Sequence, residues 1–152
     1  MTVGLLLLTT FPAVAFAADI TCGTSSDRNP DPVICEGTNN NDQIRERRGT
    51  RQDDIRAKDG NDTINVRRAG SDADTVRAQE GDDTILANDG DTRDKIDCGQ
   101  GTDTVTIDVK RENGVITASD QVSDDCETIK DQNGNTVLLT DLPAGSIGNL
   151  AV

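Results

Sequence analysis

The sequence predicts an all-β fold, a right-handed parallel β-solenoid with about 20 residues per coil. Three observations support this prediction. An Asp-x-aliphatic unit recurs at regular steps through the middle of the chain, large apolar residues are scarce, and four cysteines flank most of the repeats. These observations concern, in turn, the coils, the means by which they are stabilised, and their two ends.

The Asp-x-aliphatic unit occurs seven times between residues 37 and 106. Its aliphatic positions are Ile44, Ile55, Ile64, Val76, Ile85, Ile96 and Val105. Successive steps of 11, 9, 12, 9, 11 and 9 residues add in pairs to 20, 21 and 20. Such a period is typical of a solenoid, in which each coil supplies two short strands that stack on the next coil at about 4.8 Å. One aliphatic residue in each half-coil points inward, which predicts a core of two aliphatic columns.

The first residues of the chain predict export from the cell. Residues 3–17 carry no charge, are rich in leucine and end in Ala-Phe-Ala, a pattern typical of a secretory signal peptide. We therefore expect a signal peptide at residues 1–17, a cut after Ala17 or Ala18, and a secreted, extracellular protein. The apolar run is too short to span a bilayer as a helix, so no stable membrane insertion is expected.

The composition of the remaining chain indicates that burial of apolar side chains cannot stabilise it alone. Without the signal peptide no Phe, Tyr, Trp or His remains, and the net charge stays at −13. Low aliphatic content and high net charge are typical of chains that cannot offset the entropy of ordering by burial. Bound metal ions or disulfides are then needed to stabilise the fold.

The four cysteines, Cys22, Cys35, Cys98 and Cys126, are an even set, which in an exported chain favours disulfides. Three pairings are possible. We favour Cys22–Cys35 and Cys98–Cys126, because these two bridges would bracket the repeats. A zinc site is the alternative, but the chain has no His and no Cys-x-x-Cys motif.

The shorter, nine-residue halves of the coils carry the clearest signal for a bound cation. In three of the four a glycine stands two residues before the aspartate, and an asparagine takes that place in the fourth. Stacking would bring the four aspartates into one column, where like charges repel unless a cation lies between them. Carboxylate and backbone carbonyl oxygens are the hard ligands that calcium prefers.

Residues 37–106 resemble the repeats-in-toxin, or hemolysin-type calcium-binding, nonapeptide Gly-Gly-x-Gly-x-Asp-x-aliphatic-x. All seven units keep the Asp-x-aliphatic element, although the leading Gly-Gly pair is absent. In that family the repeats form a parallel β-roll with calcium between successive coils. The resemblance implies that calcium is held by the carboxylates of Asp42, Asp62, Asp83 and Asp103 and by the carbonyl groups of Gly60, Gly81 and Gly101.

The longer halves of the coils also place an aspartate before each aliphatic residue, at Asp53, Asp74 and Asp94. These halves carry two or three extra residues, and no Gly-x-Asp element ends at their aspartates. We therefore expect calcium along the shorter side of the solenoid and regard these three carboxylates as weaker ligands.

The domain organisation follows from the repeats and the cysteines. We expect an N-terminal cap at residues 18–36, the calcium-binding β-roll at 37–106, a C-terminal cap at 107–130, and a tail at 131–152 with one strand at 136–140. Caps are expected because an open sheet edge is a template for aggregation.

The expected function is that of a secreted calcium-binding structural protein that folds on binding extracellular calcium. No enzymatic activity is expected, because the chain after the signal peptide has no His, no Tyr and no serine-centred nucleophile motif. The alternative is a metal-free solenoid that binds a surface, such as ice or a cell adhesion partner, through an outward ladder of Thr63, Thr84 and Thr104. The acidic charge disfavours nucleic acid, whereas arginines at residues 45–56 and 67–68 leave a cell-surface or polysaccharide partner open.

Overall fold

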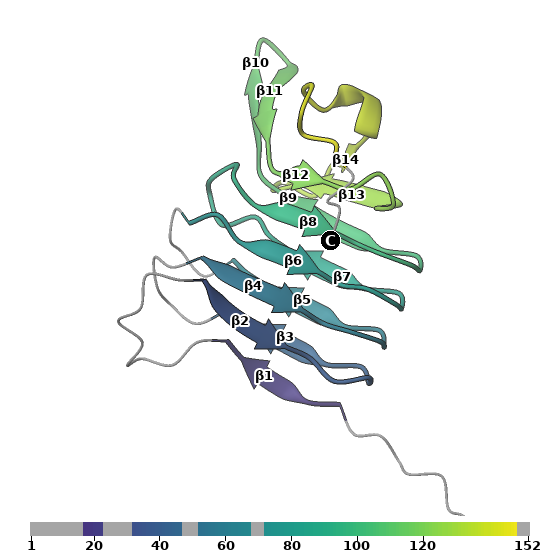
Figure 1. Cartoon of the computed structure of the whole chain (residues 1–152). Helices are drawn as coiled ribbons and strands as arrows, with labels where there is room; N and C mark the ends of the chain where they lie inside the picture. Colours follow the sequence, from purple (N-terminus) through teal and green to yellow (C-terminus); the bar gives the residue numbers. More distant parts are fainter. Residues whose placement is uncertain (1–16, 23–31, 47–51, 68–71, 149–152) are drawn as a thin grey trace, which may run out of the picture.

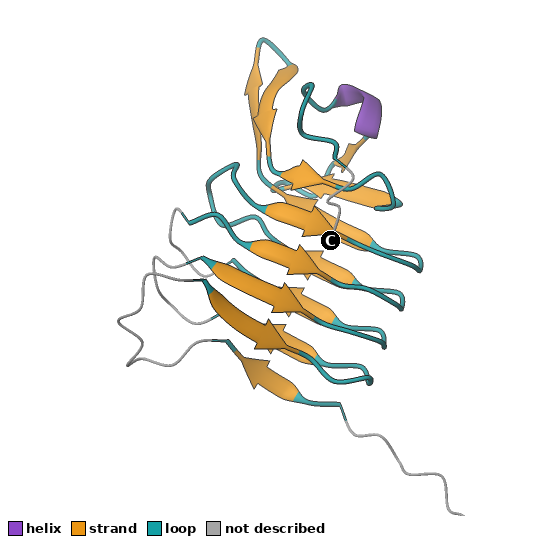
Figure 2. Cartoon of the chain, in the orientation of Figure 1, coloured by secondary structure: helices purple, strands orange, loops and turns teal. Residues whose placement is uncertain are grey.

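The computed structural model describes residues 17–22, 32–46, 52–67 and 72–148. These segments form successive coils of a solenoid, and the strands of the stacked coils make up two mainly parallel sheets (Figure 1). The predicted all-β class is confirmed, since strands dominate the described residues and only one short 3-10 helix occurs among them (Figure 2). The predicted signal peptide at residues 1–17 lies almost entirely outside the described residues.

The first sheet follows the order β1-β3-β5-β7-β9-β13-β14. All neighbours in it run parallel except the last pair, which is antiparallel. Its strands are β1 (Asp19–Thr21), β3 (Gln43–Arg45), β5 (Thr63–Asn65), β7 (Thr84–Leu86), β9 (Thr104–Ile107), β13 (Thr128–Asp131) and β14 (Thr136–Val137).

The second sheet is parallel throughout and follows the order β12-β8-β6-β4-β2. Its strands are β2 (Val33–Glu36), β4 (Asp53–Arg56), β6 (Thr75–Arg77), β8 (Lys95–Asp97) and β12 (Gln121–Val122). An antiparallel hairpin of β10 (Val109–Glu112) and β11 (Val115–Ser119) projects beyond the C-terminal end of the stack (Figure 1).

Strand register confirms the period that the sequence predicts, because equivalent aliphatic residues pair between adjacent coils. In the first sheet the column runs Ile44, Ile64, Ile85, Val105 and Ile129. In the second sheet it runs Ile55, Val76, Ile96 and Val122. Each of these side chains is at most 2% exposed. The turns from the second sheet to the first are tight, and those in the opposite direction are longer (Figure 1).

The core is four columns wide rather than the predicted two. Side chains alternate along a strand, so the residue two positions after each aliphatic residue also points inward. These additional core residues are Ala57, Ala78 and Cys98 beside the tight turns and Val66, Ala87 and Ile107 beside the longer ones, all 0% exposed. The two-column prediction was too narrow because it counted only the large residue of each half-coil.

Disulfides close the solenoid near both ends, with the favoured pairing Cys22–Cys35 and Cys98–Cys126. The bridged cysteines are 13 and 28 residues apart. In the chain-entropy description each such bridge contributes about 3–4 kcal/mol by restricting the unfolded chain.

The predicted caps are largely built as further coils of the same solenoid. Strands β1 and β2 pair in parallel with β3 and β4, so residues 18–36 supply a first coil. At the other end β12 and β13 pair with β8 and β9. The strand predicted at 136–140 is realised only at Thr136–Val137, because a 3-10 helix η1 (Leu139–Asp141) follows. Leu142 and Val137 pack on the core, so this segment covers the end of the stack.

The tight turns stack through direct backbone contact, which explains the recurring glycine. Gly60, Gly81 and Gly101 have φ of +119°, +130° and +150°. A Cβ atom on Gly81 would overlap the carbonyl oxygen of Gly60, and one on Gly101 would overlap that of Gly81. The N–H of Gly81 in turn donates to the carbonyl of Gln100 at 2.8 Å. No other residue type lets neighbouring turns approach this closely.

Gly81→Ala should therefore lower the free energy of unfolding by about 2–4 kcal/mol, the sum of backbone strain and overpacking. Gly114→Ala is the control, since Gly114 also has a positive φ of +86° but nothing lies within 4 Å of its Cβ position. Chemical denaturation at a fixed calcium concentration, followed by far-UV circular dichroism, measures the free energy of unfolding of both variants. Equal losses in the two variants would contradict the role of close turn stacking.

Candidate metal centre

A column of buried carboxylates runs along the tight-turn side, each directly before a strand of the first sheet. Asp42, Asp62, Asp83 and Asp103 are each at most 2% exposed. Each of the last three accepts, at Oδ1, a hydrogen bond from the backbone N–H of the equivalent aspartate in the preceding coil, at 2.6–2.7 Å. These dipoles lie between the charges and reduce the repulsion that stacking would otherwise create.

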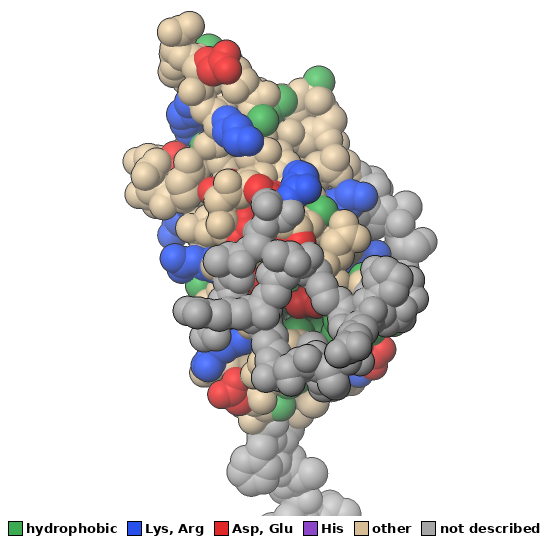
Figure 3. Space-filling model, turned by 90° about the vertical axis from the view of Figure 1, so that its left-hand side faces the viewer, with side chains coloured by type: hydrophobic (Ala, Val, Ile, Leu, Met, Phe, Trp, Pro, Cys, Tyr) green, Lys and Arg blue, Asp and Glu red, His purple; other side chains and the backbone are tan. Residues whose placement is uncertain are grey.

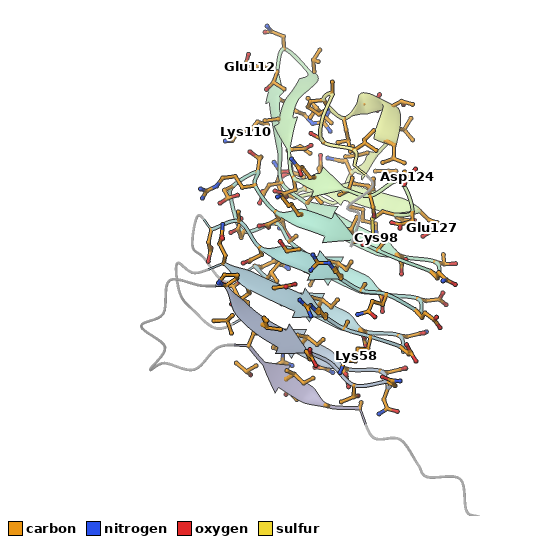
Figure 4. All side chains as sticks on the ribbon, viewed as in Figure 1. Lys58, Cys98, Lys110, Glu112, Asp124 and Glu127 are labelled. Atoms are coloured by element: carbon orange, nitrogen blue, oxygen red, sulfur yellow. A yellow bond between two sulfur atoms is a disulfide. The ribbon has the colours of Figure 1, made fainter. Side chains whose placement is uncertain are left out.

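Both ends of this tight-turn column are occupied by other residues of the chain. At the C-terminal end Glu127 Oε2 accepts the N–H of Asp103 at 2.8 Å, and Figure 4 shows Glu127 beside the tight turns. At the N-terminal end the N–H of Ala18 donates to Asp42 Oδ1 at 2.8 Å, while the N–H of Thr38 donates to Asp42 Oδ2 at 2.6 Å. Asp42 therefore has both of its carboxylate oxygens hydrogen-bonded.

The second oxygens of the next three aspartates are buried without a partner. Oδ2 of Asp62, Asp83 and Asp103 has no hydrogen-bond donor among the residues that the structure describes. A desolvated carboxylate oxygen with no donor is costly when the group is ionised. A bound cation or a proton relieves that cost, so the column has the chemistry of a cation site.

The glycines predicted as carbonyl ligands also have a structural role, which is to let neighbouring tight turns stack closely. The carbonyl oxygens of Gly60 and Gly81 face the glycine of the following coil, and the turns are joined by hydrogen bonds such as Gly60 N–H to Glu80 O at 2.8 Å. Close stacking accounts for their conformation. Their part in calcium binding, like that of Gly101, stays a prediction.

The longer-turn side has an equivalent column of carboxylates, which the sequence analysis expects to be weaker calcium ligands. The N–H of Asp53 donates to Asp74 Oδ1 at 2.8 Å, and the N–H of Asp74 donates to Asp94 Oδ1 at 2.9 Å. Asp120 continues the column by accepting the N–H of Asp94 at 3.2 Å and that of Asp108 at 2.7 Å. Oδ2 of Asp74 and of Asp94 is buried without a partner within the described segments. The two sides of the solenoid thus share one arrangement.

Burial raises the pKa values of these carboxylates, and neighbouring carboxylates raise them further. On the longer-turn side the pKa is about 9 for Asp94, about 8 for Asp120 and about 7 for Asp74. On the tight-turn side it is about 7 for Asp62 and about 6 for Asp83. Figure 3 views the longer-turn face, where carboxylate groups gather around mid-height of the stack.

Sequence reasoning missed four acidic residues that the fold brings to these columns. Asp120 stands in Asp120-Gln121-Val122, another copy of the Asp-x-aliphatic unit, and Glu127 stands in the same unit with glutamate in place of aspartate. Asp72 ends a Gly-x-Asp element two residues before Asp74. Glu46 follows Ile44 by two residues and so falls at a core position.

The fold and the site together define a disulfide-bonded parallel β-solenoid with two columns of buried carboxylates. No family model, curated protein or solved structure matches the chain. Within the described residues no helix is long and apolar enough to cross a membrane. A zinc site, the alternative to disulfides, would have no thiolate ligand, because all four cysteines are in disulfides.

Freed of divalent cations, the protein should lose stability as pH rises. The folded-state pKa values of Asp83, Asp62 and Asp94, about 6, 7 and 9, lie above the unfolded value of about 3.9. The folded state then binds more protons than the unfolded chain. This stabilisation is complete below about pH 4 and is lost as pH rises through about 6 to 9.

Far-UV circular dichroism of the cation-free protein between pH 4 and 9 measures this dependence as the fraction of folded chain, which should fall as pH rises. Asp94→Asn should make the decline shallower, because it removes the group whose pKa is raised most. A folded fraction that is constant or that rises across the range would contradict the expectation.

Proposed function

We propose that this chain is a secreted calcium-binding structural protein, a divergent relative of the repeats-in-toxin β-roll whose coils are stabilised by calcium along their aspartate columns. The observation that carries the proposal is the run of unpaired, buried Oδ2 atoms at Asp62, Asp83 and Asp103. Three successive coils offer the same oxygen at the same position. A row of cation sites requires such a buried oxygen ligand, repeated from coil to coil.

The donor set favours calcium over other cations. Carboxylate oxygens are hard ligands, and no thiolate or imidazole is present to favour a softer metal. Calcium takes six to eight oxygen ligands in flexible geometry, so side-chain oxygens can be completed by turn carbonyls or water. Asp62, Asp83 and Asp103 would hold the ions on the tight-turn side, with Asp74 and Asp94 on the other.

Export from the cell is consistent with the covalent structure. Two disulfides persist in oxidising compartments and are rare in the cytosol, and the apolar segment at 3–17 resembles a signal peptide. Extracellular calcium modules bind with dissociation constants of about 10⁻⁴–10⁻³ M. We infer that the chain crosses the membrane unfolded and orders its coils on meeting calcium, with no catalytic role.

A second candidate is a metal-free solenoid that binds a flat surface. In the first sheet Thr63, Thr84, Thr104 and Thr128 pair in register and extend the outward threonine ladder by one residue. Gln43 precedes them in the same column. Threonine also favours strands for steric reasons alone. Thermal hysteresis or adsorption by the calcium-free protein would favour this candidate.

The arginines expected to meet an anionic surface are partly engaged within the chain. Arg56 pairs with Asp54 at 2.9 Å, and Arg45 lies 3.8 Å from Asp19. Arg77, which is outside the expected set, also pairs with Asp54, at 2.5 Å. Intramolecular charge neutralisation accounts for these three residues. A polysaccharide or cell-surface partner stays a prediction.

Calcium titration of the mature, oxidised protein tests the proposed function. At neutral pH the far-UV circular dichroism spectrum should change from coil to β near millimolar calcium, with a much weaker response to magnesium. At about 100 times the dissociation constant, each site should add about 2.7 kcal/mol to the free energy of unfolding. Asp62→Asn and Asp83→Asn should each weaken the calcium response.

Asp59→Asn is the matched control, because it makes the same charge change on an exposed side chain of the same type of turn and should leave the response intact. A β spectrum that is stable in chelator and indifferent to calcium would refute the proposal. That outcome would mean that the disulfides and aliphatic columns suffice, and it would favour the metal-free binding module.

A further inference from the structure

One core column places a carboxylate, Glu46, before three apolar residues, and the last coil places a second one, Asp131, whose Oδ1 accepts the N–H of Asn135 at 2.9 Å. Glu46, Val66, Ala87 and Ile107 hold equivalent places, each directly after a strand of the first sheet or at its last residue. Glu46 is 2% exposed, and the other three are fully buried. An acidic side chain in this column costs desolvation energy that valine or alanine would avoid.

Two further carboxylates meet Glu46 from the adjacent coil. Asp72 and Asp74 stand in the longer turn that leads into β6, and Asp72 is 6% exposed and Asp74 1% exposed. One carboxylate oxygen from each of the three residues lies within 4.8 Å of the others. That spacing suits ligands of one shared ion, and it joins the coil of β3 and β4 to the coil of β5 and β6.

Unpaired oxygens at this cluster provide a second, independent observation. Both carboxylate oxygens of Asp72 and Oδ2 of Asp74 are buried with no hydrogen-bond partner among the described residues. None of the ion pairs in the described segments involves Asp72 or Asp74. Asn88, in the corresponding turn of the next coil, also has a buried and unpaired Oδ1. Neutral amide oxygen and carboxylate oxygen are both ligands for calcium.

We propose that Glu46, Asp72 and Asp74 form a distinct calcium site on the longer-turn side, which clamps two adjacent coils together. Two of the three ligands lie outside the Asp-x-aliphatic pattern, since Glu46 and Asp72 belong to no such unit, whereas Asp74 is shared with it. It rests on the proposed calcium-binding function and adds to it a site whose other two ligands the repeat motif does not supply. Asn88 has a buried, unpaired amide oxygen in the corresponding turn of the next coil.

Ion counting on the full, oxidised chain tests this site. Native mass spectrometry with calcium counts bound ions, and calorimetry gives their affinities. Glu46→Gln and Asp72→Asn should each bind one calcium ion fewer than the parent. Glu36→Gln and Asp59→Asn make the same chemical changes on exposed side chains and should keep the parent count.

Glu46→Val distinguishes loss of the calcium ligand from loss of the fold. It places in the column the residue type of Val66 and removes the carboxylate ligand, so it should also bind one ion fewer. Its denaturation midpoint should rise less with calcium than that of the parent.

The outcomes separate this inference from the proposed function. A parent protein that binds no calcium would overturn both. A parent that binds calcium, with Glu46→Gln and Glu46→Val binding as many ions at unchanged affinity, would overturn the Glu46 site alone. Loss of one ion in Glu46→Val and Asp72→Asn, but not in Asp59→Asn, would support it.

Discussion

The hydrogen bond from a backbone N–H to the aspartate of the following coil is the interaction on which the solenoid depends. It recurs on both sides, as Asp62 N–H to Asp83 Oδ1 at 2.7 Å and Asp53 N–H to Asp74 Oδ1 at 2.8 Å. Each bond satisfies a buried donor at the point where the chain leaves a turn and enters a strand. It therefore fixes the register of every strand that follows. In each half-coil a single aspartate thus helps to align the strands of adjacent coils, beside the narrow apolar core.

The same interaction also creates the acidic character of the interior. A carboxylate has two oxygens, and the backbone of one neighbouring coil offers only one N–H to it. The other oxygen is left inside the fold, as at Asp83 and Asp94. The pairing that orders the coils thus leaves buried acceptors, and their number grows with the number of coils. Stability in such a fold is tied to protons or cations in solution more closely than in a protein with an apolar core.

The sequence predicted the coils well because their signal is periodic. Seven Asp-x-aliphatic units gave the register that pairs Ile64 with Ile85, and the even cysteine count led to the observed disulfides. The signal failed where a residue departs from its column. Glu46 stands two residues after Ile44, the inward position that also holds Val66, but a charged residue there breaks the aliphatic pattern by which the column is recognised. Asp72 escaped notice because it stands four residues before the aliphatic Val76, two more than the aspartate of the repeat unit. Spacing along the chain cannot show which turn residues fold back inward.

If the chain is cut after Ala17, one of the two positions that the signal-peptide prediction allows, the contact between Ala18 and Asp42 changes its charge. The backbone nitrogen of Ala18 lies 2.8 Å from Asp42 Oδ1, at the N-terminal end of the tight-turn column. Cleavage after Ala17 would turn this amide into a free α-amino group with a positive charge. The neutral donor would become an ammonium ion facing a buried carboxylate, and such charge-assisted bonds are about twice as strong as neutral ones. Removal of the leader would then place a fixed counter-ion at the base of an acidic column, and the precursor and the mature chain would differ in the electrostatics of their first coil.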